Sequence, residues 1–149
     1  MMVGNTPDAH LQALIHSYEQ RLAHLVPFAE VVLPGAPSLP ALGQKQKEGA
    51  QLIAKLRPGD VAVLLDERGS EYTSRGLAEF INKQAVSGAK RLVFIIGGAY
   101  GFSEEVYRAV PLRCSLSKLT FPHDLVRLIA AEQLYRAFAI LNHLPYHHD

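Results

Sequence analysis

The sequence predicts an α/β fold, a single domain over residues 1–149 with a mostly parallel sheet and helices on both of its faces. Segments with the apolar spacing of helices alternate along the chain with short apolar segments of strand character. Two of these strands, 61–65 and Arg91–Ile96, are apolar at nearly every position. Such strands are typical of parallel sheets, which are buried on both faces.

Composition narrows the protein classes. A chain of 149 residues that is 48% hydrophobic can bury a core, and its net charge of +1 excludes a strongly basic surface for nucleic acid. The single cysteine, Cys114, excludes an internal disulfide and a cysteine-based zinc site. Residues 1–8 lack the features of a signal peptide, and no apolar run approaches the ~20 residues of a membrane helix. We therefore expect a cytoplasmic protein that does not enter a membrane.

The first half of the chain begins with a helix. Thr6 has the side chain of an N-cap and Pro7 suits the first helical position, so the helix is expected to start there and to stop before Pro27. A strand, a proline-rich loop and a polar-faced helix are predicted next, at 28–33, 34–43 and 44–56. The strand 61–65 follows and is expected to stop at a turn, residues 66–69.

The second half repeats the alternation. Ser74 is the expected N-cap of a helix that ends at Gly88. After the strand Arg91–Ile96 and a glycine-rich segment, Ser103 opens a short helix whose first turn is acidic, as the helix dipole favours. The remaining segments are a strand, a loop, a long helix and a tail, at 112–116, 117–123, 125–141 and 145–149.

Ligands of parallel α/β sheets bind beyond the carboxyl ends of the strands, which here are residues 66–69, 97–101 and 117–123. The glycines of 97–101 suit either a close backbone approach to a ligand or a structural turn, and they match neither a phosphate-binding nor a dinucleotide-binding motif. Residues 117–123 suit either a functional loop or a cap in which Thr120 or His123 satisfies the first amides of the last helix. Asp66 suits a ribose or base contact, or a salt-bridged turn.

No hydrolase motif is present, and Cys114 has no credible histidine partner. The histidine-rich end contains His143, His147 and His148 with Asp149. Adjacent histidines on a tail seldom provide the fixed geometry of a metal site. We expect no metal there, and the tail is either solvated or contacts a polyanion or substrate.

The last predicted helix is apolar over most of its circumference, which indicates burial on more than one side. A dimer interface and an internal core helix are both compatible with that pattern. Polar residues within this helix would pair across such an interface: Arg127, Glu132, Gln133, Tyr135 and Arg136. Local cations elsewhere that would form a basic patch are Lys45, Lys47, Arg75, Arg113 and Lys118.

Longer motifs carry a family resemblance across nearly the whole chain. They are FIIGGAYGFSEE from Phe94, SLSKLTFPH from Ser115, Arg127, EQLYRA from Glu132 and PYH from Pro145, with KEG from Lys47 and LDERG from Leu65 in the first half. These motifs resemble the RlmH family, the 23S rRNA pseudouridine-1915 N3-methyltransferases of the SPOUT class. Residues 1–3 are shorter than the first strand of that family, which would leave the strand around Val32 short of a neighbour.

The resemblance implies an α/β knot, in which the C-terminal segment forms a deep trefoil, and a homodimer packed through the last helix. It also implies S-adenosylmethionine as cofactor and no metal. The cofactor contacts that it carries over are Leu65, Gly97, Leu116, Ser117, Lys118, Leu119, Thr120 and Phe121.

The implied reaction is methylation of N3 of pseudouridine 1915 in 23S rRNA of the assembled ribosome. N3 carries a proton, so a base or a group that stabilises the developing anion is needed, and His123 is the catalytic candidate for this role. Tyr146, His147 and His148 would contact the RNA, and His148 stands where some relatives carry arginine. The alternatives are a tRNA methyltransferase of the same class and a ribosome-binding protein of this fold without catalytic activity.

Overall fold

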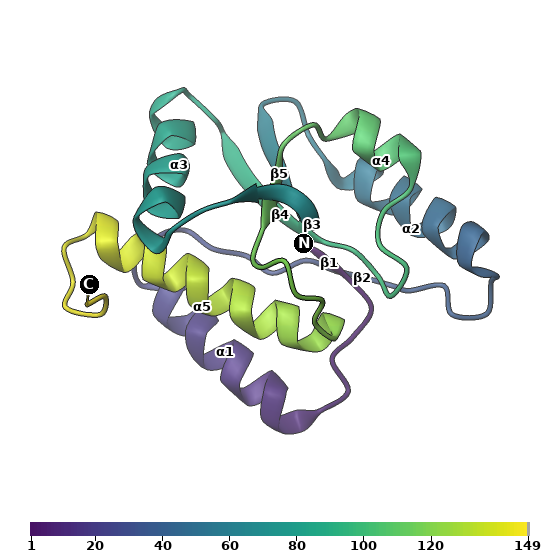
Figure 1. The fold of residues 1–149 in the computed structure, drawn as a ribbon, viewed down its shortest axis with the longest axis horizontal. Helices are drawn as coiled ribbons and strands as arrows, with labels where there is room; N and C mark the ends of the chain where they lie inside the picture. Colours follow the sequence, from purple (N-terminus) through teal and green to yellow (C-terminus); the bar gives the residue numbers. More distant parts are fainter. Residues whose placement is uncertain (149) are drawn as a thin grey trace.

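The computed structural model describes residues 1–148 and contains a five-stranded sheet with helices on both faces, which confirms the predicted α/β class (Figure 1). The strand order is β2-β1-β4-β3-β5, and neighbouring strands are parallel. The strands are β1 (Met2–Val3), β2 (Val32–Leu33), β3 (Asp60–Glu71), β4 (Arg91–Ile96) and β5 (Arg113–Ser115). The helices are α1 (Ala9–Ala23), α2 (Ala41–Lys55), α3 (Ser74–Val86), α4 (Glu104–Ala109) and α5 (His123–Leu141).

The centre of the sheet is the pairing of β3 with β4, in register from Asp60 opposite Arg91 to Leu65 opposite Ile96. Successive side chains of a strand point to opposite faces. Those of the two central strands are covered on both sides, which explains why their sequences are apolar without alternation.

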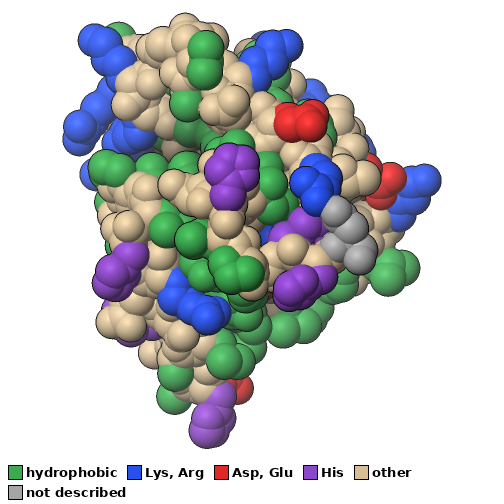
Figure 2. All heavy atoms as spheres, turned by 90° about the vertical axis from the view of Figure 1, so that its left-hand side faces the viewer, with side chains coloured by type: hydrophobic (Ala, Val, Ile, Leu, Met, Phe, Trp, Pro, Cys, Tyr) green, Lys and Arg blue, Asp and Glu red, His purple; other side chains and the backbone are tan. Residues whose placement is uncertain are grey.

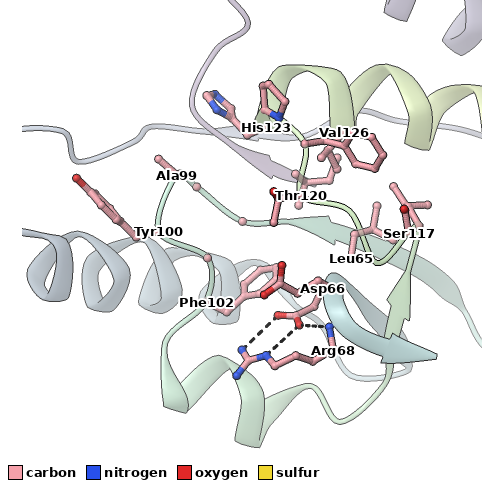
Figure 3. A pocket seen from close by; sticks show the side chains of 18 of the residues that line it. Leu65, Asp66, Arg68, Ala99, Tyr100, Phe102, Ser117, Thr120, His123 and Val126 are labelled. Atoms are coloured by element: carbon pink, nitrogen blue, oxygen red, sulfur yellow. Dashed lines mark hydrogen bonds and ion pairs between the residues drawn. The ribbon is translucent and has the colours of Figure 1, made fainter. Parts of the chain in front are cut away.

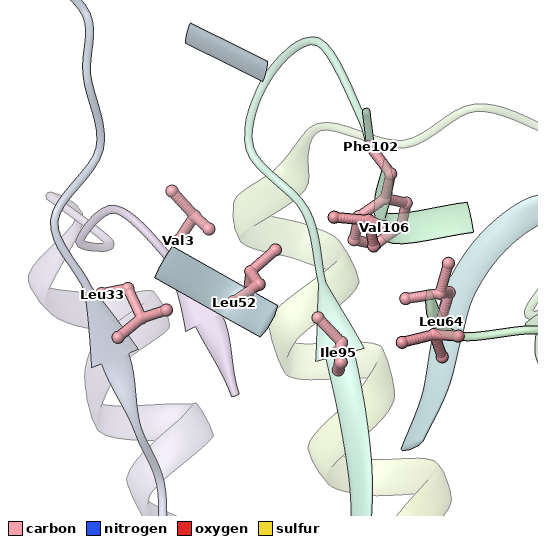
Figure 4. Close-up of a cluster of buried hydrophobic side chains, with 8 residues drawn as sticks. Val3, Leu33, Leu52, Leu64, Ile95, Phe102 and Val106 are labelled. Atoms are coloured by element: carbon pink, nitrogen blue, oxygen red, sulfur yellow. The ribbon is translucent and has the colours of Figure 1, made fainter. Parts of the chain in front are cut away.

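Two hydrophobic clusters hold the layers together. On one face, Leu52 of α2 and Val106 of α4 pack with Leu64 and Ile95 of the central strands (Figure 4). On the other face, the buried residues of α3 and α5 pack against β3 and β5. Helix α1 lies along α5, outside that face (Figure 1). Each fully buried aliphatic side chain contributes roughly 1.5–3 kcal/mol, so these clusters are the main source of stability.

The N-terminal segment forms a strand, although it is only two residues long. Met2 pairs with Val32 on one side and with Ile96 on the other. The strand around Val32 therefore has a neighbour, contrary to the expectation from the sequence, although β2 itself is as short as β1.

The predicted cap of α1 is wrong. Asp8 is the N-cap, and its carboxylate accepts hydrogen bonds from the amides of His10 and Leu11 at 2.8 and 3.0 Å. Thr6 is buried instead, and its hydroxyl accepts a hydrogen bond of 2.7 Å from Nη1 of Arg127 in α5. A long-range contact thus determines which of two suitable side chains caps the helix.

The turn predicted at residues 66–69 is also wrong, because β3 continues to Glu71. Strand β3 pairs with β5 twice, with Leu65 and again with Ser70 opposite Cys114, and a bulge lies between these two positions. Gly69 lies in this bulge, where an added Cβ would be 2.6 Å from the amide nitrogen of Cys114. Only glycine permits such an approach of two backbones.

The other boundaries differ by a few residues. Helix α2 begins at Ala41 after Pro40, and Thr73 rather than Ser74 caps α3 through a bond of 3.0 Å to the amide of Gly76. Ser103 caps α4 as predicted. None of the helices in residues 1–148 combines the length and the hydrophobicity that crossing a membrane requires.

Candidate functional site

A cavity of about 530 Å³ lies beside the middle of β3 and at the carboxyl ends of β4 and β5 (Figure 3). This volume is within the usual range of small-molecule sites, roughly 300–1,000 Å³. Residues 65–68 within β3 and the segments that follow β4 and β5 contribute to its wall. Most of the cofactor residues implied by the resemblance line it, together with His123: Leu65, Gly97, Leu116, Ser117, Leu119, Thr120 and Phe121.

The segment 97–101 forms a tight turn at the wall of the cavity. The amide of Gly101 donates to the carbonyl of Gly98 at 3.0 Å, and Gly101 has a φ of 75°, in the region that favours glycine. A Cβ on Gly97 would lie 3.1 Å from the ring of Phe102. The turn is therefore structural, and it also presents backbone to the cavity.

The acidic side of the cavity is formed by Asp66. Its carboxylate accepts hydrogen bonds from the hydroxyl of Tyr107 at 2.6 Å and from the backbone amide of Arg68 at 2.9 Å, and it forms an ion pair of 3.2 Å with the guanidinium of Arg68. Burial opposes ionisation, but the hydrogen bonds from Tyr107 and Arg68 prevail and lower the pKa of Asp66. Burial and the bond to Asp66 raise the pKa of Tyr107 to about 12. Asp66 is therefore ionised, and the cations of Arg68 and Lys45 line the same cavity.

The loop that closes the cavity is held by its own serines. Ser115 Oγ donates to the carbonyl of Ser117 at 2.9 Å, and Ser117 Oγ accepts from the amide of Leu119 at 3.0 Å. Neither Thr120 nor His123 caps α5, since the N-cap is Pro122 and no side chain bonds to the free amides there. The capping interpretation of this loop is therefore wrong.

His123 is the first residue of α5 and lies at the edge of the cavity (Figure 3). Its side chain is 42% exposed, and Nε2 is 3.3 Å from Oδ1 of Asp124. Asp124 is in turn 3.8 Å from the guanidinium of Arg127. An imidazole in this position is accessible to a ligand and has an adjacent carboxylate.

One implied cofactor residue, Lys118, does not line the cavity, although Ser117 and Leu119 on either side of it do. The ammonium of Lys118 is 3.9 Å from Glu71, and its side chain is 86% exposed. Conversely, the cavity includes Lys45 of α2, Tyr107 of α4 and Val126 of α5, which the strand-end rule does not reach. These residues reach the cavity because their helices pack against the sheet, so no local motif in the sequence identifies them.

The C-terminal tail is placed at the other end of α5. That helix has 19 residues, which span roughly 28 Å at 1.5 Å per residue. Tyr146 lies among aromatic and charged side chains, with its hydroxyl 3.1 Å from Glu132 Oε1 and its ring 4.7 Å from that of Tyr135. Nδ1 of His147 is 3.3 Å from Nη1 of Arg136. Tyr146, His147 and His148 do not line the cavity of their own chain.

The face around this tail carries more basic and histidine side chains than acidic ones (Figure 2). Arg21 of α1 lies over the rings of Tyr18, Tyr135 and Tyr146, with its guanidinium 4.9 to 5.7 Å from their centres. Such cation–π contacts leave the guanidinium charge available. Within residues 1–148, no group of histidines, cysteines and acids has the arrangement of a metal site, and Asp149 lies outside the described residues.

The polar residues of α5 find partners within the chain. Arg127 donates to the carbonyls of Val3 and Gly4 at 2.6 and 2.8 Å. Arg136 forms an ion pair of 2.5 Å with Glu132. Gln133 also donates to Glu132, and Tyr135 packs against Tyr18 and Tyr146. These contacts lie within one chain, so pairing across a dimer interface stays a prediction.

Comparison with known proteins agrees with the resemblance. A family model described as "Predicted SPOUT methyltransferase" matches residues 1–147. Three similar relatives are each named "Ribosomal RNA large subunit methyltransferase H". The chain is 45% identical to the one from Parabacteroides distasonis and 47% to the one from Bacteroides fragilis, over 100% of the chain and 97% of each relative. It is 46% identical to the one from Christiangramia forsetii, over 98% of the chain and 95% of that relative.

Proposed function

Because the chain belongs to the SPOUT methyltransferases, and among them to the ribosomal RNA large subunit methyltransferase H group, we propose that it transfers a methyl group from S-adenosylmethionine to 23S rRNA. The observation that carries this proposal is the cavity, because the carboxyl ends of β4 and β5 converge on it together with residues 65–68 of the neighbouring β3. In sheets of this kind that edge is where ligands bind.

The residues of the cavity fit the cofactor. Its apolar lining, which includes Leu65, Leu116 and Val126, suits the adenine ring, and backbone at Gly97 is open to close approach. S-adenosylmethionine carries positive charges on its sulfonium and amino groups and a negative charge on its carboxylate, and the cavity wall offers both Asp66 and Glu67 and the cations Lys45 and Arg68. When bound, the cofactor supplies the methyl group as an electrophile.

The chain itself has to orient the target base and remove a proton. In our proposal the target is N3 of pseudouridine 1915, and His123 accepts its proton, with Asp124 beside the imidazole. Holding the reacting atoms in line is worth up to about 7–11 kcal/mol of the barrier. Lys45, at the wall of the cavity, is the cation suited to contact an RNA phosphate.

We propose that the enzyme is a homodimer packed through α5 and that its C-terminal segment is knotted. What supports the dimer is the distance of the tail from its own cavity, since Tyr146, His147 and His148 reach a cavity only if it belongs to a second copy. Half-buried apolar side chains along α5, Leu128 and Ile129 among them, supply surface for such an interface. A ribosomal substrate in turn implies a cytoplasmic location.

The test is methyl transfer to ribosomes that lack the modification, with labelled S-adenosylmethionine. An N3-methyl group blocks Watson–Crick pairing, so reverse transcription of the product is expected to stop at pseudouridine 1915. Incorporation of labelled methyl into tRNA instead of ribosomes would contradict this proposal and would indicate a tRNA methyltransferase. No incorporation into either RNA would favour the ribosome-binding protein without catalytic activity.

A further inference from the structure

Glu48 of α2 is a buried carboxylate behind the segment 97–101. Glu48 is only 3% exposed, and its Oε1 accepts a hydrogen bond of 3.0 Å from the backbone amide of Ala36. In the part of the chain that the structure describes, no cation forms an ion pair with it. A buried carboxylate without a counter-ion is costly, so its position needs a physical reason.

The second oxygen of Glu48 faces the glycine turn. A Cβ added to Gly98 would overlap Oε2 and would lie 3.2 Å from the carboxyl carbon. The next residue, Gly49, extends this close approach, because a Cβ there would be 2.5 Å from Oγ of Ser103. Helix α2 is therefore pressed against the back of the segment whose front lines the cavity.

Besides Glu48, the buried ring of Phe102 packs against the turn at Gly97. Three of its five residues are glycines, and each has more backbone freedom to lose than any other residue. Its internal restraint is the bridge between Gly98 and Gly101. The carboxylate of Glu48 cannot move aside freely, because its other oxygen is tied to Ala36 in the loop before α2.

We propose that Glu48 is a positioning residue, which holds residues 97–101 from behind in the conformation that accepts S-adenosylmethionine. This inference rests on the proposed function. Glu48 does not line the cavity, and it acts through the backbone of Gly98. A turn that is ordered before binding costs less conformational entropy when the ligand arrives, so its support improves affinity.

A double-mutant cycle on cofactor binding tests the contact. In the wild-type background we expect Gly98→Ala to weaken S-adenosylmethionine binding, measured by calorimetry, by about 10-fold or more, because the new Cβ meets Oε2. In the Glu48→Ala background the collision is gone, and we expect Gly98→Ala to change affinity by no more than about 2-fold. Equal losses in both backgrounds would overturn the proposal.

Three controls make the cycle specific. The Cβ that Gly97→Ala adds would meet Phe102 rather than Glu48, so the loss of affinity is expected to be the same in both backgrounds. Glu48→Gln keeps the shape of the side chain, so the penalty of Gly98→Ala is expected to persist in it. Glu105→Ala removes an exposed carboxylate of α4 and is expected to leave affinity unchanged. If Glu48→Ala does not fold, Glu48→Asp replaces it in the cycle, because the shorter side chain moves Oε2 away from Gly98 by one methylene.

Hydrogen exchange of the ligand-free protein separates this inference from the proposed function. We expect the amides of residues 98–101 to exchange about 10-fold faster in Glu48→Ala, while those of β4 keep their protection. Unchanged exchange at these amides would refute the role of Glu48, whatever the cofactor does. If wild-type protein does not bind S-adenosylmethionine at all, the proposed function fails, and exchange still decides the role of Glu48.

Discussion

At the scale of single residues, the cavity wall contains the ionised carboxylate of Asp66 and the accessible imidazole of His123. Asp66 accepts bonds from Tyr107 and Arg68, which keep it charged despite its burial. His123 has no such network and remains open to solvent beside Asp124. A group held this tightly is suited to binding, whereas an exposed imidazole next to a carboxylate is suited to accepting a proton.

His123→Ala is expected to lower the rate of methyl transfer by about 100-fold or more, the usual share of a general base. Affinity for S-adenosylmethionine is expected to stay within a factor of about 2, because backbone and apolar side chains dominate the cavity wall. Single-turnover kinetics and calorimetry measure the two effects. His24→Ala, at an exposed position after α1, is the matched control. A rate equal to wild type in His123→Ala would exclude this role.

A pH dependence of stability is expected from Glu19 of α1. Burial, and then the charge and hydrogen bond of Glu30, raise the pKa of Glu19 from 4.5 to about 7. The folded protein thus binds more protons than the unfolded chain between these values, so the free energy of unfolding falls as pH rises through this window.

Glu19→Gln removes that ionisation. It is expected to raise the free energy of unfolding at pH 7.5 by on the order of 1 kcal/mol, a value discounted for solvent screening, and to change it little at pH 5. Urea unfolding at both pH values measures the difference. A gain of the same size at pH 5 would mean that charge on Glu19 is not the cause.

At the scale of elements, the two central strands and the glycine turn were predictable because their signals are local. A run of apolar residues indicates a strand buried on both faces, and the strand-end rule then indicates the edge where ligands bind. The continuation of β3 beyond Leu65 was not predictable. It depends on the second pairing with β5, and residues 66–69 have the composition of a turn.

The resemblance indicated a shortened first strand, but the pairing of β1 with β2 and β4 was not predicted, since two residues show no periodicity. Lys45 and Tyr107 reach the cavity from helices on one face of the sheet, and only the packing of those helices brings them there. The choice of Asp8 over Thr6 as helix cap depends on Arg127, which is more than 100 residues away in the sequence. Most of the features that could not be predicted from the sequence therefore depend on contacts between residues far apart in the chain.

Gly69→Ala tests the second pairing of β3 with β5. Its Cβ would meet the backbone of Cys114 at 2.6 Å, and the strands would have to separate. We expect a loss of about 2 kcal/mol or more in the free energy of unfolding. Gly43→Ala is the matched control in helix α2, where the nearest atom would be 3.6 Å away. It is expected to stabilise the protein by up to about 1 kcal/mol, because alanine is the better helix former. A Gly69→Ala variant with the free energy of unfolding of the wild type would contradict the close approach of β3 and β5 at this bulge.

At the scale of the whole molecule, Arg127 joins the last helix to the first residues of the chain. It is 2% exposed and donates hydrogen bonds to Val3, Gly4 and Thr6. Burial lowers its pKa, although Asp124 opposes this shift. These bonds add to the backbone hydrogen bonds that hold β1 between β2 and β4, such as those from Met2 to Val31 and from Ile96 to Met1.

Arg127→Met fills similar space but cannot donate, so the carbonyls of Val3 and Gly4 lose their partner. We expect the free energy of unfolding to fall by about 3 kcal/mol and the amides of β1 to exchange faster. Arg57→Met, at an exposed position, is expected to stay within about 0.5 kcal/mol of wild type. If Arg127→Met is as stable as Arg57→Met, Arg127 does not anchor the N-terminal strand.

The measurement that tests the central claim most directly is a titration of the protein with S-adenosylmethionine, followed by the resonances of its backbone amides. The account predicts saturable shifts confined to the segments around the cavity, residues 65–68, 97–101 and 116–123, with little change on the exposed side of α3. Shifts elsewhere, or no saturable binding, would contradict the assignment of this cavity as the cofactor site.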